Sequence, residues 1–287
     1  MSSLDTWLEG RGPVRLGCAA SLGLGLFFIF AWAPHPWGWH GIDQYHTLAL
    51  QLARGERFQT TDVPWGYAYF LAAFYRLFGE RLWIPLVAQA ILNATAPLIA
   101  YHLVASLLDR KTAAVTALLV GALSFNTIYA STQSSDSVCT VLFLLGTLAA
   151  VRSLQDASWR MAALAGLAFG LASQLRPNLI AFPLVWALMY LWRPLVTQAD
   201  GRRPGDFSRR WSTPAIIVLL ALAVDVPWIV RNYRLTREFI PTSTHGSVQL
   251  WYGTLQVGPY LNSRAHNPAS LFEAPAFDYV SLDRVPI

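Results

Sequence analysis

A single carboxylate, Asp43, lies just beyond the end of the first long apolar segment of the chain and is the first residue that could do chemistry. It opens the stretch from Gly41 to Phe78, whose two helix-like segments are too polar or too short to cross a bilayer. A carboxylate at the head of such a loop lies where lipid, water and protein meet. It can keep its charge there and serve acid or base chemistry beside a lipid headgroup. The other interpretation is that Asp43 caps a helix starting at Gln44.

Two arginines could bind the phosphate of a lipid-linked molecule. Arg176 precedes a proline at a break between two short apolar segments, and Arg231 follows the last apolar segment. A guanidinium stays protonated and can bind phosphate oxygens through two parallel hydrogen bonds. For Arg176 the alternative is a side chain that only reaches toward water from a helix end.

Two further carboxylates lie near or within apolar segments. Asp136 is expected to cap the fourth span or to lie in its first turn, where the helix dipole favours an anion. Asp225 lies inside an apolar segment, where a carboxylate is costly and indicates a functional pathway or a paired charge. Its position near one end of that segment places it where water can reach it.

The composition is that of a membrane protein. Hydrophobic residues make up 54% of the chain and charged residues 13%, against ~25% charged residues in ordinary soluble domains. No basic groove with interleaved aromatic residues is evident, so nucleic acid is not an expected partner. Neither a nucleotide-binding loop nor a metal-ligand cluster is evident, and Cys18 and Cys139 fall inside apolar segments as buried small residues.

Seven apolar segments are expected to cross the membrane, which predicts an all-α, polytopic membrane protein. Their predicted bounds are Leu16 to Ala33, Ile84 to Leu108, Thr112 to Ala130, Ser137 to Val151, Met161 to Leu175, Leu179 to Leu191 and Pro214 to Val230. The fifth and sixth are short against the ~17 to 25 residues that a spanning helix needs. In the second span, Gln89, Asn93 and Pro97 are spaced by four and should face the bundle.

Other elements are expected around and within these spans. The first external loop, residues 34–83, should carry two interfacial helices, Tyr45 to Arg54 and Tyr67 to Phe78, which stop at glycines. Gly166 and Gly170 form a small-xxx-small pair suited to close helix packing. Residues 231–287 contain no further span and are predicted to be an external segment, after a transmembrane domain at 1–230.

The distribution of basic residues predicts the orientation. When alternate loops are assigned to opposite sides, eleven of the 21 basic residues lie with the N-terminus, against six acidic residues on that side. The other side has ten of each sign. Cytoplasmic loops carry the excess of Lys and Arg, so the N-terminus should be cytoplasmic, and Asp43, Asp136, Arg176 and Arg231 should share the external face.

Several short motifs, in order, resemble the bacterial dolichyl-phosphate-mannose protein mannosyltransferase-like enzymes, a GT-C class group that includes the lipid A aminoarabinose transferases. The resemblance covers residues 16–256. Its motifs are Asp43-Gln44-Tyr45-His46, Pro64-Trp65-Gly66-Tyr67, Ser135-Asp136, Leu175-Arg176-Pro177, Pro227-Trp228-Ile229-Val230-Arg231-Asn232-Tyr233, Ser243-Thr244 and Leu250-Trp251-Tyr252-Gly253. The chain departs from the family in having Pro64-Trp65 for two prolines, Asp136 for a glutamate, and Asp225.

The resemblance implies an inverting glycosyltransferase of a bacterial inner membrane. It would move a sugar from a polyprenyl-phosphate carrier to a glycan, lipid or protein acceptor at the external face. Asp43 would be the general base, and Arg176 and Arg231 would bind the phosphate of the donor.

The same resemblance makes Tyr45, His46, Tyr67 and Asp136 possible further site residues. Asp225 is a possible site residue on other grounds, because it is a carboxylate inside an apolar segment. No cofactor is expected because the donor is lipid-linked, although some relatives use a divalent metal.

Two other interpretations stay open at the level of sequence. Family members usually continue through several more spans, so the chain is expected to be the N-terminal part of a longer enzyme, or an inactive fragment. A non-catalytic transporter or lipid-binding membrane protein would also fit the short, proline-broken spans and the intramembrane Asp225.

Overall fold

A computed structural model describes residues 3–31, 38–40, 44–123, 125–156, 158–196 and 207–244. The chain divides into two compact units, Met1–Thr242 and Ser243–Ile287. Asp43 and the Leu250-Trp251-Tyr252-Gly253 motif lie outside the described residues, as do residues 245–287 of the predicted external segment.

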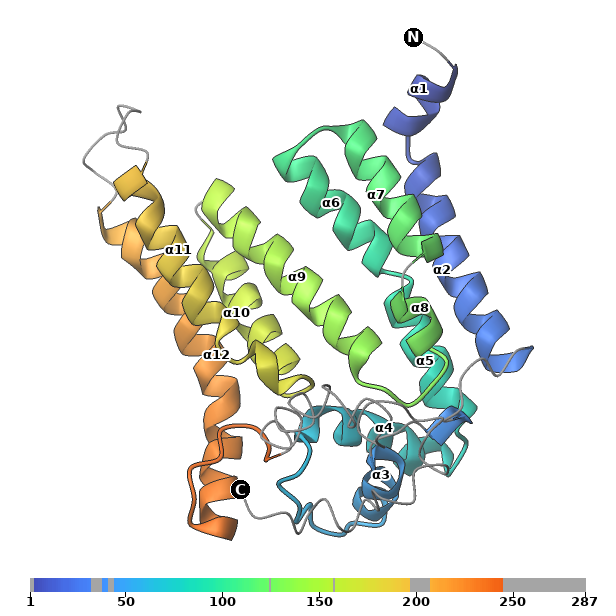
Figure 1. The fold of residues 1–287 in the computed structure, drawn as a ribbon, viewed down its shortest axis with the longest axis vertical. Helices are drawn as coiled ribbons and strands as arrows, with labels where there is room; N and C mark the ends of the chain where they lie inside the picture. The colour runs from blue at the N-terminus through green and yellow to red at the C-terminus, as the bar shows by residue number, and fades with distance from the viewer. Residues whose placement is uncertain are drawn as a thin grey trace, which may run out of the picture. The chain divides into compact units, whose positions relative to one another are not determined.

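Regular structure in the described ranges is entirely helical (Figure 1). The helices are α1 (Ser3–Glu9), α2 (Gly12–Phe30), α3 (Tyr45–Ala53), α4 (Trp65–Phe78), α5 (Trp83–Asn93), α6 (Ala96–Leu107), α7 (Arg110–Leu123), α8 (Phe125–Tyr129), α9 (Asp136–Gln155), α10 (Trp159–Ser173), α11 (Phe182–Val196) and α12 (Phe207–Thr236). Two 3₁₀ turns, η1 (Gly38–His40) and η2 (Pro177–Leu179), lie between them. The described residues of all seven predicted spans are mainly helical, and the predicted all-α class is confirmed.

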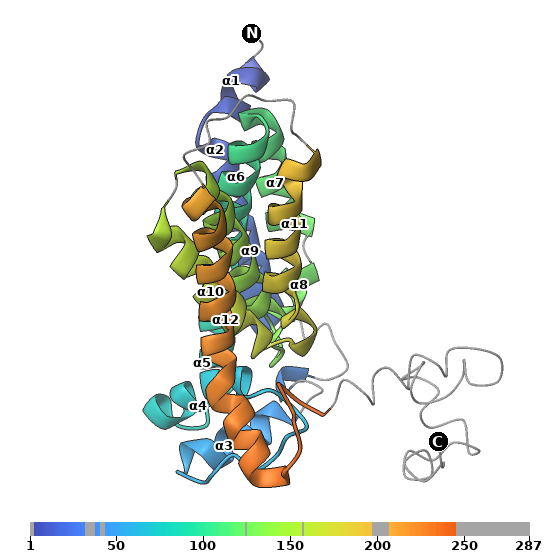
Figure 2. The ribbon, with the colours of Figure 1, turned by 90° about the vertical axis from the view of Figure 1, so that its left-hand side faces the viewer.

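The long helices lie alongside one another, and α3 and α4 lie at one end of them (Figures 1 and 2). We call this the α3–α4 end. The turns that precede α9 and follow α10 are at the same end, whereas α1 and the α6–α7 turn are at the opposite end. This matches the predicted alternation of the loops.

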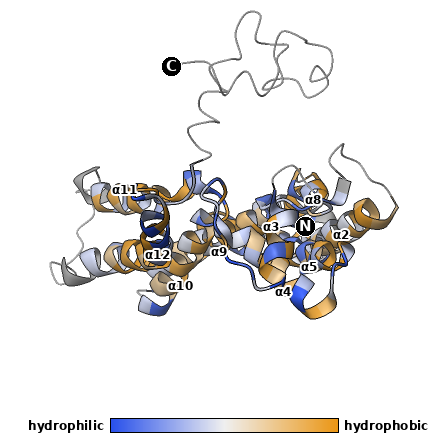
Figure 3. Ribbon diagram, turned by 90° about the horizontal axis from the view of Figure 1, so that it is seen from below, coloured by the Kyte–Doolittle hydropathy of each residue, from blue (hydrophilic) through white to orange (hydrophobic). Residues whose placement is uncertain are grey.

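The outer surfaces of the long helices are apolar. Four helical stretches are long and apolar enough to cross a membrane within the described residues: Gly12–Phe30, Trp83–Leu107, Asp136–Gln155 and Trp211–Thr236. Trp159–Ser173 and Pro177–Trp192 are apolar but shorter, as predicted. Large side chains such as Leu119, Met189 and Leu219 are more than half exposed. In Figure 3 most of the ribbon of the long helices has the orange colour of hydrophobic residues. Such surfaces suit lipid contact, so the chain is a multi-pass membrane protein.

The second predicted span is broken in the middle. Helix α5 ends at Asn93 and α6 begins at Ala96, with Pro97 in its first turn. Proline has no N–H and its ring clashes with the carbonyl four residues earlier, so a continuous helix is disfavoured there. The prediction that Gln89 and Asn93 face the bundle is confirmed, because their exposed fractions are 0% and 2%.

Close helix packing holds α10 against α12. A Cβ atom added at Gly166 would lie 2.7 Å from the Ile217 carbonyl oxygen, and one at Gly170 would lie 2.8 Å from that of Ala221. Only glycine allows the main chains to approach this closely. The predicted role of the small-residue pair is confirmed.

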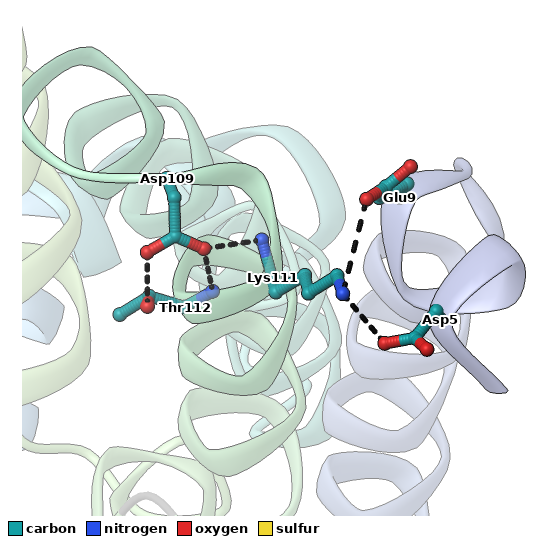
Figure 4. A network of polar contacts seen from close by, with 5 residues as sticks. All are labelled: Asp5, Glu9, Asp109, Lys111 and Thr112. Carbon is teal, nitrogen blue, oxygen red and sulfur yellow. Dashed lines mark hydrogen bonds and ion pairs between the residues drawn. The ribbon is translucent and has the colours of Figure 1, made fainter. Parts of the chain in front are cut away.

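A polar network fixes the end opposite α3 and α4 (Figure 4). Asp109 accepts hydrogen bonds from the N–H groups of Lys111 (2.9 Å) and Thr112 (3.0 Å) at the start of α7. These bonds and one from the Thr112 hydroxyl lower the pKa of Asp109. Lys111 Nζ lies 2.5 Å from Asp5 Oδ1 and 4.0 Å from Glu9 Oε1, which ties α7 to α1.

Candidate functional site

One buried apolar cluster joins the elements that carry most of the predicted site residues. We call it the Tyr67 cluster. Its members are Tyr45, Leu48, Ala49, Phe58, Val63, Tyr67, Ala68, Leu71, Ala72, Tyr75, Val138, Cys139, Ala172, Leu175 and Trp228. They come from α3, α4, the loop between them, the start of α9, the end of α10 and α12. Arg176 directly follows a member of this cluster in sequence, and Asp43 precedes its first member by two residues.

The two interfacial helices form as predicted and end at glycines. Helix α3 ends before Gly55 (φ 86°) and α4 before Gly79 (φ 74°), and both angles favour glycine. Helix α3 starts at Tyr45, with Gln44 at its N-cap. The predicted helix start at Gln44 is one residue earlier, and the predicted cap, Asp43, lies outside the described residues.

Tyr45 and Tyr67, two possible site residues, are core residues here. Their rings meet edge to face with centroids 5.0 Å apart. The Tyr67 hydroxyl donates to Gln89 Oε1 (2.6 Å), and Gln89 Nε2 donates to the carbonyls of Tyr129 and Thr132 (3.0 Å each). Burial raises the pKa of Tyr67 well above its ordinary value. These tyrosines hold α3 and α4 against α5 and the turn before α9.

His46, a third possible site residue, belongs to a network that the sequence did not indicate. Its Nδ1 lies 3.0 Å from the Tyr75 hydroxyl, and its Nε2 lies 3.4 Å from Glu80 Oε1. The Tyr75 hydroxyl also accepts a hydrogen bond from Gln133 Nε2 (2.5 Å), so its own proton can go to His46. That arrangement needs an unprotonated Nδ1. Burial raises the pKa of Tyr75 to about 12.

We expect acid to destabilise the fold through His46. Burial, with a smaller effect of His40, lowers its pKa, and Glu80 opposes this only in part. Because the pKa of His46 is lower in the folded state, the unfolded state binds more protons below about pH 6.5. The stabilising contribution is thus present above that pH and is lost as the pH falls. The melting temperature should drop between about pH 7.5 and about pH 5.5.

His46→Gln should reduce this drop in melting temperature, because glutamine does not titrate. The matched control is His102→Gln, at an exposed position on α6, which should leave the drop unchanged. If the melting temperatures of wild type and His46→Gln fall equally between these pH values, His46 is not the group that causes the drop.

Asp136 and Arg176, predicted on one face, form an ion pair. Arg176 Nη2 contacts Asp136 Oδ1, and the Ser134 hydroxyl donates to the other carboxylate oxygen. Asp136 is the first residue of α9, and no side chain caps this helix, so the first-turn position is correct and capping is not. Arg176 lies in extended conformation before Pro177, between α10 and η2. Its side chain is 42% exposed, so a ligand can reach it.

The turn before Arg176 is joined to the start of α4. The Gly66 N–H donates to the main-chain oxygen of Gln174 at 3.0 Å. Gly66 lies in the first turn of α4, where an N–H has no partner within the helix. We call this contact the Gly66–Gln174 junction. It explains why the Pro64-Trp65-Gly66-Tyr67 motif contains a glycine.

Gly66→Ala is expected to lower the melting temperature. A Cβ atom there would lie 2.7 Å from the Gln174 oxygen and 3.1 Å from its carbon, and main-chain atoms cannot move aside cheaply. Such overpacking costs ~1 to 3 kcal/mol of unfolding free energy. The control is Gly23→Ala on α2, where a Cβ would meet nothing within 4 Å and should be neutral or stabilising. If both variants keep the wild-type melting temperature, the Gly66–Gln174 junction can accommodate a Cβ atom without loss of stability.

Arg231 clamps the loop between α3 and α4 to α12. Its guanidinium donates to the carbonyls of Thr60 (2.8 Å) and Phe58 and to Asn232 Oδ1 (2.8 Å), and lies 4.3 Å from the ring centroid of Trp228. It also lines a cavity of about 500 Å³. The lining residues are Glu56, Arg57, Phe58, Gln59, Tyr69, Trp228, Arg231, Arg234 and Leu235. Two of these residues, Arg57 and Arg234, were not predicted as site residues from the sequence.

Asp225 is hydrogen-bonded by two neutral side chains and not by the paired charge that one of the two predicted interpretations required. Its carboxylate, in α12, is 2% exposed. Oδ1 accepts hydrogen bonds from the Ser173 hydroxyl (2.7 Å) and from Gln174 Nε2 (2.5 Å) at the end of α10. The expectation that water reaches this carboxylate is not met in the structure. Among the described residues, which do not include Asp43, no group of three His, Cys, Asp or Glu side chains could hold a metal ion.

The fold and these contacts define a multi-pass membrane protein with an exposed arginine–aspartate pair at one end of its helices. A family model, dolichyl-phosphate-mannose-protein mannosyltransferase, matches residues 62–230, more than half of the chain. The chain belongs to this family and is thus a membrane glycosyltransferase of the GT-C type. No curated protein matches the chain.

Proposed function

We propose that the protein transfers a sugar from a polyprenyl-phosphate carrier to a glycan, lipid or protein acceptor, with inversion at the anomeric carbon. The reaction takes place at the external face of a bacterial inner membrane, with the N-terminus in the cytoplasm. The supporting observation is that α3, which follows Asp43, and the turn that carries Arg176 meet in the Tyr67 cluster at one end of the membrane helices. This end is the one with no excess of basic residues.

In this proposal Asp43 takes the proton of the acceptor hydroxyl as its oxygen attacks the anomeric carbon. The bond from that carbon to the phosphate oxygen breaks, and the polyprenyl phosphate leaves with the electron pair through an oxocarbenium-like transition state. Negative charge on the phosphate grows as the bond breaks. Arg176 stabilises that charge, and Asp136 holds its guanidinium in place.

Arg231 is the second phosphate-binding candidate. Its cavity brings Arg57 and Arg234 together with the aromatic rings of Tyr69 and Trp228, which suits an anionic headgroup attached to an apolar chain. Since Arg231 already donates to two loop carbonyls, it contributes by shaping the cavity as well as by charge. The transporter alternative gains no support from Asp225, because Ser173 and Gln174 bond its carboxylate.

The test is transfer of label from a radiolabelled polyprenyl-phosphate sugar in proteoliposomes that contain the purified chain. Label should leave the polyprenyl-phosphate donor, and appear on the glycan, lipid or protein acceptor, only when that acceptor is added. The face is tested with Thr60→Cys and Gly205→Cys, which should react with an impermeant thiol reagent from opposite sides. The unsubstituted chain controls for its native cysteines. Reaction of both from outside would overturn the topology, and retention of the sugar on the lipid with every acceptor would overturn the donor assignment.

A further inference from the structure

Asp225 is a buried carboxylate for which the proposed reaction has no use. It lies within the apolar stretch Trp211–Thr236 of α12 and is 2% exposed. A carboxylate in such a place is costly unless hydrogen bonds compensate for its lost hydration. The bonds that it accepts come from Ser173 and Gln174, the last residue of α10 and the one after it.

Gln174 depends on this carboxylate for its position. Its side chain is fully buried, and its Nε2 donates to Asp225 while its Oε1 has no hydrogen-bond partner. The opposite amide orientation would place two acceptors against each other, because a carboxylate oxygen cannot donate. The hydrogen bond to Asp225 is therefore what orients this amide.

The main chain of the same residue makes the Gly66–Gln174 junction. Gln174 is thus bonded to α12 through its side chain and to α4 through its carbonyl. Two residues later comes Arg176, whose N–H donates to Ala172 (2.9 Å) and whose guanidinium contacts Asp136. The position of Arg176 is consequently tied to that of the Gln174 turn.

We infer that Asp225 is a positioning residue for the site: by accepting hydrogen bonds from Ser173 and Gln174 it fixes the turn that forms the junction with α4 and presents Arg176. Its effect on the junction is a property of the fold. Its effect on donor binding rests on the role proposed for Arg176. The required property is that of a hydrogen-bond acceptor, which asparagine shares with aspartate through its Oδ1.

The test compares Asp225→Asn and Asp225→Leu by amide hydrogen exchange at Gly66. The N–H of Gly66 is protected by the Gln174 carbonyl alone, since it lies in the first helical turn. Its exchange should be about tenfold faster in Asp225→Leu and within about twofold of wild type in Asp225→Asn. The apparent KM for the lipid-linked donor should rise about tenfold in the leucine variant alone, with kcat nearly unchanged.

Asn93→Leu is the matched control, because Asn93 is equally buried and donates to Ser21 (3.1 Å) between α2 and α5. It should lower the melting temperature without changing Gly66 exchange or the donor KM. If Asp225→Leu does not fold, Gln174→Met removes the same hydrogen bond from the other side and should reproduce its effects.

Wild-type exchange at Gly66 in a folded Asp225→Leu or Gln174→Met variant would overturn the inference. Equal losses in Asp225→Asn and Asp225→Leu would overturn it too, because the negative charge would then be the required property. A changed exchange rate with an unchanged donor KM would overturn the link to Arg176. If wild type transfers no sugar from any donor, the proposed function fails, and the exchange result still decides whether Asp225 fixes the junction.

Discussion

Asp43→Asn is expected to lower sugar transfer ~10²- to 10⁴-fold without lowering the yield of folded protein. Asparagine keeps the shape of the side chain and caps a helix about as well as aspartate, but it cannot take a proton from the acceptor. The base and capping interpretations of Asp43 therefore predict opposite results in one variant.

Both folded yield and single-turnover transfer should be measured, because a loss of folded protein would imitate a loss of chemistry. Asp62→Asn is the matched control, since it removes an exposed carboxylate from the same loop and should retain wild-type transfer. If a well-folded Asp43→Asn variant transfers sugar at nearly the wild-type rate, Asp43 has no place in the mechanism. Should the chain need a further segment for activity, the comparison is made in that longer form.

The sequence was sufficient for the features that depend on neighbours along the chain. Helix α3 was predicted because its apolar residues recur with helical spacing up to Gly55, and α4 because a run of mostly apolar residues ends at Gly79. The inward direction of Gln89 and Asn93 followed from the same spacing, since lipid cannot satisfy an amide. Pro97 was noted, but the break that it causes between α5 and α6 was not predicted.

The contacts of the site could not be read from the sequence, because they join residues far apart in the chain. Asp136 and Arg176 were predicted on one face with separate roles, and their ion pair was not foreseen. Nothing in the local pattern distinguishes Gln174 from any other polar residue at a helix end, yet it bonds both α12 and α4. Tyr75, Glu80 and Gln133 were missed for the same reason: only the packing of α4 against α3 and the turn before α9 brings them to His46.

Arg176→Lys is expected to weaken donor use by ~1 to 3 kcal/mol, which is about fivefold to about 150-fold in the apparent KM. Lysine keeps the positive charge but loses the planar fork that can bond Asp136 and a phosphate oxygen at the same time. The exposure of the Arg176 side chain, at 42%, is high enough for a ligand to reach it and shows that its pairing with Asp136 is not a buried structural one.

Two further variants separate recognition from charge. Arg160→Lys, at the opposite end of the bundle over the Trp159 ring, makes the same chemical change and should leave donor use unaltered. Asp136→Asn removes the negative charge of the partner but leaves an acceptor oxygen and the guanidinium, so it should raise the donor KM less than Arg176→Lys does. If Arg176→Lys uses the donor with the wild-type rate and KM, Arg176 is only a helix-end residue held toward water. The phosphate would then have to bind elsewhere, and the cavity of Arg57, Arg231 and Arg234 is the remaining cluster of cations near the Tyr67 cluster in the described part of the chain.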